Sequence, residues 1–279
     1  MKILLVSSGS GSRGGGEIFL NYLGGALAAH GHSVTTWMPA HARMNELASQ
    51  CARFSRVVRA EFRNTYDYRS RSLATLLNAR SSNDIARQWA ELKPDIIHVN
   101  KQNLEDGLDL LRAARVSGRP SVCTIHLTQT ARYLRARAAS LRDMVSWWEL
   151  RKFEGDFVAV QDARRNELSS FLGSEAKTRT IFNGVPQVDL RQAHALRGSM
   201  RAELGISNDQ LLVVGLGRLA PQKKPFAFLE IAKKLREQYP HVRFAWVGDG
   251  ELSAEWQAAI ARNGLSDVVM WTGWKSDVR

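Results

Sequence analysis

Residues 2–17 read KILLVSSGSGSRGGGE, and this stretch gives the clearest indication of the fold class. A short apolar run, Lys2–Ser8, is followed directly by glycines and then by a segment of helical periodicity that begins at Glu17. Glycines between a strand and a helix let backbone amides approach an anion at the helix N-terminus, where the helix dipole favours negative charge. The stretch therefore predicts the first strand and helix of an anion-binding α/β domain.

The same alternation of short apolar runs and helical segments continues along the chain, which is typical of βαβ units and parallel sheet. The expected strands of the first domain are Lys2–Ser8, Ser33–Met38, Asp95–Asn100, Ser121–His126, Phe157–Gln161 and Arg179–Phe182. The helices between them include Glu17–Ala29, Leu73–Leu92 and Leu104–Val116. These six strands make a complete first domain.

A second series of elements follows the segment Asn183–Leu196, which has little periodic hydrophobicity and predicts a connection between domains. Its expected strands are Leu211–Leu216, Arg243–Val247 and Val268–Thr272, and its helices are Phe226–Tyr239 and Ser253–Asn263. Three strands are few for a doubly wound domain, so the second domain is predicted to be incomplete. The predicted division is residues 1–186, a linker and leading helix over 187–208, and a partial domain over 209–279.

Composition narrows the classes of partner. The 279 residues carry a formal net charge of +12, which favours an anionic partner such as a phosphorylated substrate, anionic lipid or nucleic acid, although a solvated basic surface explains it equally. No motif of a nucleic-acid-binding fold accompanies the charge. No apolar run approaches the roughly 20 residues of a transmembrane helix. Cys51 and Cys123 have neither zinc-site spacing nor a disulfide framework, which fits a cytoplasmic protein.

The glycine loop satisfies the dinucleotide fingerprint GxGxxG through Gly9, Gly11 and Gly14. A dinucleotide site also needs an acid at the end of the second strand, and residues 34–41, VTTWMPAH, contain neither Asp nor Glu. Arg43 could instead hold the phosphate of NADP. An NAD(P)-binding oxidoreductase therefore stays open as a weaker alternative, as does a glycine turn that only permits close packing.

Five segments, in order along nearly the whole chain, carry a resemblance to a known family. They are Gly14–Glu17 (GGGE), Ile181–Pro186 (IFNGVP), Gly217–Pro225 (GRLAPQKKP), Val247–Gly250 (VGDG) and Trp271–Trp274 (WTGW). Their order and spacing resemble the family 4 glycosyltransferases of the GT-B fold. The resemblance implies an α/β protein of GT-B type with two Rossmann-like, doubly wound parallel-sheet domains, the second incomplete.

The resemblance also implies a site for a nucleotide-diphosphate sugar. Transfer of the sugar leaves negative charge on the departing phosphate, which Arg218 and Lys223 are expected to bind without a metal or other cofactor. The donor is expected to contact Gly15, Gly16, Gly217, Gly248 and Gly250 in addition to these two cations. Lys224 departs from the family pattern, which has glycine there, so the loop loses a residue tolerant of positive φ.

Three further residues are assigned through the resemblance. His126 is expected to position the donor and stabilise charge at the anomeric centre, and His98 and Glu17 are expected on the acceptor side. Glu17 could equally serve the dipole of its own helix. Family 4 enzymes retain the anomeric configuration, so the leaving phosphate is expected to help deprotonate the acceptor hydroxyl. The implied reaction is transfer to a glycan or lipid-linked acceptor in bacterial cell-surface polysaccharide or lipopolysaccharide synthesis.

Two features bear on partners and completeness. Residues 131–153 mix arginines with tyrosine, leucine and tryptophan at helical spacing, which predicts either a helix on an anionic membrane or a core helix with a solvated basic face. The paired glutamates that the family carries further along its second domain do not occur. The chain is therefore expected to be a fragment or a truncation, with a non-catalytic acceptor- or membrane-binding module as the alternative to an enzyme.

Overall fold

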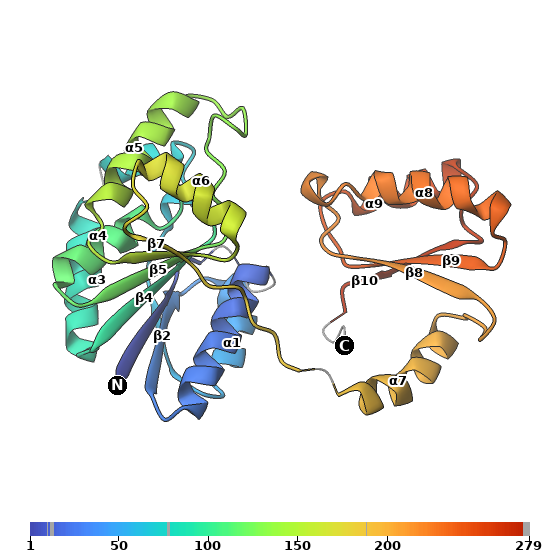
Figure 1. Ribbon diagram of the computed structural model, residues 1–279, viewed down its shortest axis with the longest axis horizontal. Helices are drawn as coiled ribbons and strands as arrows, with labels where there is room; N and C mark the ends of the chain where they lie inside the picture. The colour runs from blue at the N-terminus through green and yellow to red at the C-terminus, as the bar shows by residue number, and fades with distance from the viewer. Residues whose placement is uncertain (10, 12–13, 77–78, 188, 276–279) are drawn as a thin grey trace. The chain divides into compact units, whose positions relative to one another are not determined.

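The computed structural model describes residues 1–9, 11, 14–76, 79–187 and 189–275. It divides into two compact units, Met1–Pro186 (unit 1) and Gln187–Arg279 (unit 2), and each is described by itself (Figure 1). Both are α/β units built on parallel sheets, which confirms the fold class predicted from the alternation of apolar runs and helical segments.

Unit 1 contains a seven-stranded parallel sheet in the order β3-β2-β1-β4-β5-β6-β7. Its strands are β1 (Lys2–Ser7), β2 (Ser33–Pro39), β3 (Arg56–Ala60), β4 (Ile96–Lys101), β5 (Ser121–Ile125), β6 (Asp156–Ala159) and β7 (Thr178–Thr180). The order reverses at β1, whose neighbours are β2 and β4. Ligands of open α/β sheets bind at such a switch point, beyond the carboxyl ends of the strands.

Helices cover both faces of this sheet (Figure 1). They are α1 (Gly15–Ala29), α2 (Asn45–Cys51), α3 (Ala79–Leu92), α4 (Leu108–Ser117), α5 (Ala139–Lys152) and α6 (Asp162–Leu172). On one face Leu20 of α1 and Leu47 of α2 pack with Leu5 of β1. On the other, Trp89 of α3 and Leu111 of α4 pack with the buried residues of β4 and β5. The two apolar cores hold the sheet rigid, so its carboxyl edge is a firm support for functional side chains.

Three expectations about unit 1 were wrong. The expected six-stranded sheet has a seventh strand, β3, and α2 precedes it. The expected helix Leu73–Leu92 is a 3₁₀ segment, Arg71–Leu76, and the separate helix α3.

The expected helix over residues 131–153 begins only at Ala139, because Arg135 and Ala138 adopt left-handed backbone conformations, with φ of 53° and 51°. The carboxylate of Asp143 accepts hydrogen bonds from the backbone N–H groups of Ala131 and Arg132 and holds the turns in place.

Unit 2 contains a three-stranded parallel sheet in the order β10-β9-β8. Its elements are α7 (Leu190–Glu203), β8 (Leu211–Leu216), α8 (Pro225–Gln238), β9 (Val242–Val247), α9 (Ser253–Arg262) and β10 (Val269–Gly273). Phe244 and Trp256 are fully buried between the sheet and its helices. Along β8, which is an edge strand among the described residues, Leu211, Val214 and Leu216 are more than half exposed.

Candidate functional site

The loops at the carboxyl edge of the unit 2 sheet are joined by backbone hydrogen bonds. The N–H of Gly217, after β8, donates to the carbonyl of Val247 at 3.0 Å, and the N–H of Leu219 donates to the carbonyl of Asp249 at 2.9 Å. The N–H of Gly248, after β9, donates to the carbonyl of Gly273 at 2.8 Å. The segments that carry the three predicted motifs of unit 2 therefore form one supported edge.

Two glycines of this edge are required by close backbone contacts. Gly248 has φ of +134°, and a Cβ there would collide with the carbonyl of Gly217. A Cβ on Gly250 would likewise collide with the carbonyl of Leu219. Both expected donor-binding glycines thus lie against the loop after β8, where they allow the loops to approach each other.

The two predicted phosphate-binding cations stand on this edge. Arg218 directly follows Gly217, and Lys223 ends the short 3₁₀ turn Pro221–Lys223. Both side chains are exposed, and the aliphatic part of Lys223 lies beside Gly217, 3.4 Å from where a Cβ would stand. Among the described residues neither side chain takes part in an ion pair.

Helix α8 begins next to these cations, with Pro225 in its first turn, as predicted. Its 14 residues give a dipole whose positive end points toward the loop. Pro225 has no N–H and the N–H of Ala227 donates to the carbonyl of Lys224, so an anion at this end would meet mainly the helix dipole and two exposed cationic side chains.

Lys224 connects the cation loop to α8 with φ of 49° and ψ of 51°, which is the left-handed conformation. The sequence comparison with the family motif indicated that this position suits glycine. The loop keeps the geometry that glycine favours, and the lysine adopts it at a cost of about 1 kcal/mol.

The carboxyl edge of unit 1 carries the other predicted residues. Helix α1 begins at Gly15, and the carbonyl of Gly14 accepts the first helical hydrogen bonds. Gly16 is buried, and a Cβ there would collide with the side-chain amide of Gln102. Glu17 is 4% exposed, and its carboxylate lies against Gly14. Glu17 therefore supports the glycine segment, while Ser10, Ser12 and Arg13 lie outside the described residues.

His126 follows β5 and is tied to α1 through Asn100, a residue that the sequence did not single out. Asn100 is fully buried at the end of β4, and its Nδ2 donates to the carbonyl of Gly16 at 2.8 Å. Its Oδ1 lies 2.9 Å from Nε2 of His126. Since the amide group of Asn100 must face the Gly16 carbonyl, Oδ1 is an acceptor and Nε2 of His126 carries the proton. Nδ1 is then the ring's acceptor.

His98 lies within β4 rather than at its end, and its Nε2 is 2.8 Å from Oγ1 of Thr124. Phe19 of α1 contacts both imidazoles, with ring centroids 6.4 Å from His98 and 5.2 Å from His126. Burial lowers the pKa of each histidine to about 4. Both imidazoles are therefore neutral near pH 7 and act by hydrogen bonding rather than as cations.

Two buried ionisable residues, Lys101 and Asp106, lie close to the loops at the carboxyl edge of unit 1. Lys101 is fully buried on β4, and burial lowers its pKa while raising that of Asp106 nearby. The carboxylate of Asp106 accepts hydrogen bonds from Ser8 Oγ, at 2.6 Å, and from the N–H of Gln102. This links the end of β1 to the loop after β4, and so steadies the region around Gly16.

Two glycosyltransferase family models together match most of the chain. The family model described as Glycosyltransferase Family 4 matches residues 13–187, and the model described as Glycosyl transferases group 1 matches residues 197–279. The chain belongs to glycosyltransferase family 4. This family 4 chain is 26% identical over 219 residues to the UDP-Gal:alpha-D-GlcNAc-diphosphoundecaprenol alpha-1,3-galactosyltransferase of Escherichia coli, covering 75% of this chain and 54% of that protein. It is 27% identical over 172 residues to the alpha-D-kanosaminyltransferase of Streptomyces kanamyceticus, covering 58% of this chain and 44% of that protein.

The chain thus spans about half the length of these curated relatives. Among solved structures, it is similar to Anabaena Alr3699/HepE in complex with UDP and glucose, with a TM-score of 0.74 and 21% identity over 99% of this chain and 70% of that one. It is also similar to WaaG, a glycosyltransferase involved in lipopolysaccharide biosynthesis, with a TM-score of 0.67 and 13% identity over 99% of this chain and 71% of that one. These neighbours share the GT-B fold.

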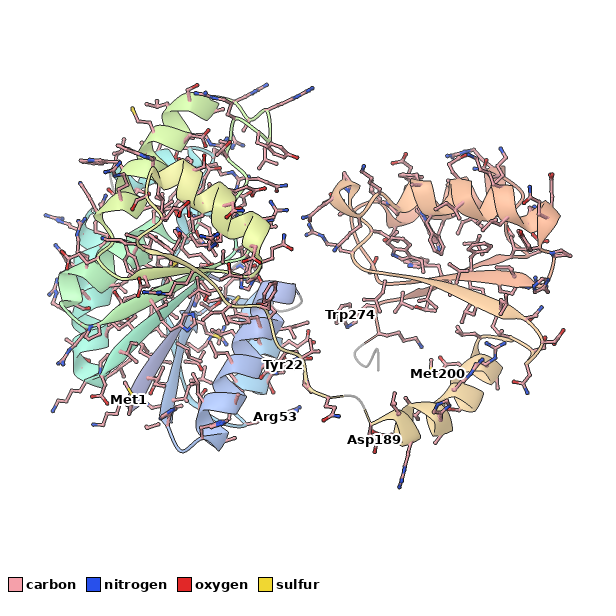
Figure 2. The ribbon with its side chains drawn as sticks, viewed as in Figure 1. Met1, Tyr22, Arg53, Asp189, Met200 and Trp274 are labelled. Carbon is pink, nitrogen blue, oxygen red and sulfur yellow. The ribbon has the colours of Figure 1, made fainter. Side chains whose placement is uncertain are left out.

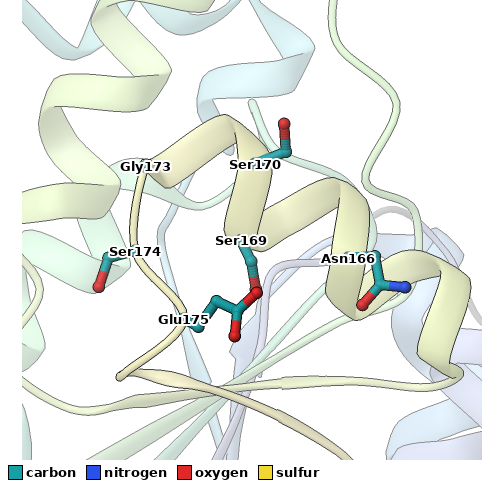
Figure 3. Close-up of a pocket in the computed structure, with 6 residues that line it drawn as sticks. All are labelled: Asn166, Ser169, Ser170, Gly173, Ser174 and Glu175. Carbon is teal, nitrogen blue, oxygen red and sulfur yellow. The ribbon is translucent and has the colours of Figure 1, made fainter.

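Three other features of the described residues bear on the alternatives considered from the sequence. Arg43, the residue considered for an NADP phosphate, forms an ion pair with Asp67 at 2.6 Å. A surface hollow lined by Asn166, Ser169, Ser170, Gly173, Ser174 and Glu175 lies where α6 ends and leads toward β7, at the amino edge of the sheet (Figure 3). Among the described residues, no cluster of side chains could hold a metal ion, and no helix is long and apolar enough to cross a membrane.

Proposed function

We propose that this protein transfers a sugar from a nucleotide-diphosphate sugar to a glycan or lipid-linked acceptor. The observation that carries the proposal is the placement of two exposed cations, Arg218 and Lys223, at the positive end of α8 in a chain of glycosyltransferase family 4. A diphosphate matches this site in charge, and its oxygens match the donors in chemistry.

In the proposed reaction, the bond between the anomeric carbon and the diphosphate oxygen breaks, and negative charge grows on that oxygen. Arg218 binds the phosphate oxygens through two parallel N–H groups, while Lys223 supplies a point charge beside them. The positive end of the α8 dipole faces the same anion. These donors supply the charge stabilisation that a metal gives in many phosphate enzymes, so the proposal includes neither a metal nor another cofactor.

In unit 1, neutral His126 accepts a hydrogen bond from a sugar hydroxyl through Nδ1, because Nε2 is occupied by Asn100. Its ring dipole faces the anomeric centre as positive charge develops there. Gly15 and Gly16 bring the start of α1 close to the donor. We place Glu17 and His98 on the acceptor side, where Glu17 acts by holding the glycine segment.

The reaction is proposed to retain the anomeric configuration. The acceptor hydroxyl attacks from the face that the diphosphate leaves, its oxygen bonds to the anomeric carbon, and its proton passes to the departing phosphate oxygen. No carboxylate base is then needed. The galactosyltransferase relative carries a diphosphoundecaprenol acceptor in its name, and WaaG is involved in lipopolysaccharide biosynthesis, so we propose a cytoplasmic enzyme of bacterial cell-envelope glycan assembly.

Calorimetric titration with UDP- and GDP-sugars tests the phosphate site. Arg218→Ala and Lys223→Ala should each weaken binding about 10- to 100-fold, because each removes a charge-assisted contact. Lys234→Ala, which removes an exposed charge further along α8, is the matched control and should bind as the wild type does. Undiminished binding by both site variants would refute the assignment. Binding that is normal but unaccompanied by transfer would favour the non-catalytic module.

A further inference from the structure

We propose that one exposed surface of unit 1 docks on an anionic lipid bilayer. This surface, called here the α5 surface, consists of the loop 132–137 and the outward side chains of α5. Figure 1 shows α5 and the loop before it at one end of unit 1. The inference is independent of the proposed sugar transfer.

Large apolar side chains are exposed on both parts of the α5 surface. The inner side of α5 is buried through Val145 and Leu150. Its outer side carries Leu141, Met144 and Trp148, which are 47%, 56% and 47% exposed and follow the i, i+3, i+7 spacing of one helix face. Trp147 on α5, and Tyr133 and Leu134 in the loop, are exposed as well.

Basic side chains surround these apolar groups. Arg132, Arg135, Arg137 and Arg151 are exposed, and Lys152 is half-buried. The two carboxylates of residues 131–153 both have partners within unit 1. Asp143 accepts from the backbone of the loop, and buried Glu149 forms an ion pair with Arg112 at 2.6 Å. The exposed charge of the α5 surface is therefore strongly positive, which complements anionic lipid headgroups.

Trp147 and Trp148 of α5 each have a basic side chain over the ring. The guanidinium of Arg151 lies 4.8 Å from the ring centroid of Trp147, and Nζ of Lys152 lies 3.0 Å from that of Trp148. Such pairs combine an apolar ring with a charged tip. Tryptophan and arginine arranged in this way suit the boundary between acyl chains and phosphate groups.

The apolar component favours a bilayer over a nucleic acid. The apolar side chains of Leu134, Leu141 and Met144 form no hydrogen bond or ion pair with a phosphate backbone, whereas they can enter the acyl region of a membrane. The α5 surface is also continuous with the candidate site, since the chain runs from His126, at the end of β5, directly into the loop. Docking would place the carboxyl edge of the unit 1 sheet near molecules held in the bilayer.

Sedimentation of the full chain with vesicles tests the proposal. Wild-type protein should sediment with vesicles of phosphatidylcholine and phosphatidylglycerol, more strongly as the anionic fraction rises and less strongly in high salt. The triple variant Arg132→Gln, Arg135→Gln, Arg137→Gln should lower the partition coefficient about a hundredfold, at about fivefold for each charge lost near an anionic surface.

The matched control is Arg53→Gln, Arg56→Gln, Arg119→Gln, which removes the same charge from exposed positions outside the α5 surface. Arg53 lies at the opposite end of unit 1 from α5 in Figure 2. The control variant should partition at least tenfold more strongly than the loop variant. Equal losses in both variants would reduce the effect to net charge and overturn the proposal, as would the absence of vesicle binding.

A second variant tests the apolar part. In Trp147→Ser, Trp148→Ser the salt-sensitive binding should fall at least tenfold, and quenching of tryptophan fluorescence by brominated lipids should be largely lost. Circular dichroism confirms that each variant is folded. Unchanged quenching in this variant would overturn insertion of the α5 surface, and vesicle-independent binding to single-stranded DNA with higher affinity would favour the nucleic-acid alternative.

Discussion

Replacement of Asn100 by alanine should loosen the start of α1 and free the ring of His126. The side chain is fully buried and forms hydrogen bonds with two groups that are far apart in the sequence, the carbonyl of Gly16 and Nε2 of His126. Alanine leaves both without this partner. A buried group deprived of its hydrogen bond costs about 1–3 kcal/mol, and half-buried His126 can recover part of that from water. We therefore expect Asn100→Ala to lower the free energy of unfolding by about 2–4 kcal/mol.

Asn100→Asp gives a contrasting result at the same position. A carboxylate still accepts from His126, but it opposes the carbonyl of Gly16. A negative charge beside the imidazole favours its protonated form, so the pKa of His126 should rise from about 4 toward or above its ordinary value. Thr124→Val removes the partner of His98 and leaves Asn100 in place, so it should leave the tautomer of His126 unchanged.

Nitrogen-15 NMR of histidine-labelled protein checks the inference, since the two ring nitrogens report which one carries the proton. The wild type should show a proton on Nε2 of His126 near pH 7, and Asn100→Ala should show a mixture of tautomers. Denaturant unfolding supplies the free energies. A wild-type ring protonated on Nδ1 would refute the hydrogen-bond assignment, whatever the stability of the variants.

Two further predictions concern backbone strain and pH. Lys224→Gly should stabilise unit 2 by about 0.5–1 kcal/mol in denaturant unfolding, because glycine adopts the left-handed conformation without strain. The control Lys234→Gly, inside α8, should destabilise unit 2 by about 1 kcal/mol. A lower free energy of unfolding for Lys224→Gly would contradict the strain argument. The stability of unit 1 should depend on His98, whose pKa of about 4 lies below its unfolded value near 6.5, so this contribution is full above pH 6.5 and is lost as the pH falls toward 4. Asp109, whose pKa burial raises to about 7, acts in the opposite direction, so comparison of the wild type with His98→Gln isolates the contribution of the histidine. Between pH 7.5 and 4.5, the free energy of unfolding of the variant should fall by about 2 kcal/mol less than that of the wild type. Equal losses in the two proteins would contradict the prediction.

The sequence predicted the main strands well because parallel strands buried on both faces are continuous apolar runs. The run Lys2–Ser8, for example, became the buried strand β1, Lys2–Ser7. Strand β3 was missed because Arg56–Ala60 contains two arginines, which an edge strand with a single neighbouring strand can keep at the surface. The first part of residues 131–153 has the residue types of a helix, but Asp143 binds its backbone and fixes turns instead.

The candidate site was predictable where a motif carries it and unpredictable where tertiary contacts do. Arg218, Lys223 and the glycines after β9 lie within short segments of recognisable order, and the fold brings them to one edge. Asn100 could not be singled out, because its role depends on Gly16 and His126, 84 and 26 residues away. A polar residue at the carboxyl end of a parallel strand was the available signal, and it needs the register of β4 with β1 and β5 to gain meaning.

The two units differ in the kind of polar group they present, and this difference bears on the division of labour in the proposed reaction. Unit 2 offers exposed cations at a helix N-terminus, which suit a diphosphate whose charge grows during transfer. Unit 1 offers imidazoles kept neutral by burial and held in place by asparagine and threonine, which suit hydroxyl groups of fixed orientation. In the proposed reaction, a cation in place of His126 would oppose the positive charge that develops at the anomeric carbon. In the proposed reaction, burial of the histidine and its hydrogen bond to Asn100 would therefore meet the same requirement, a directional acceptor without charge.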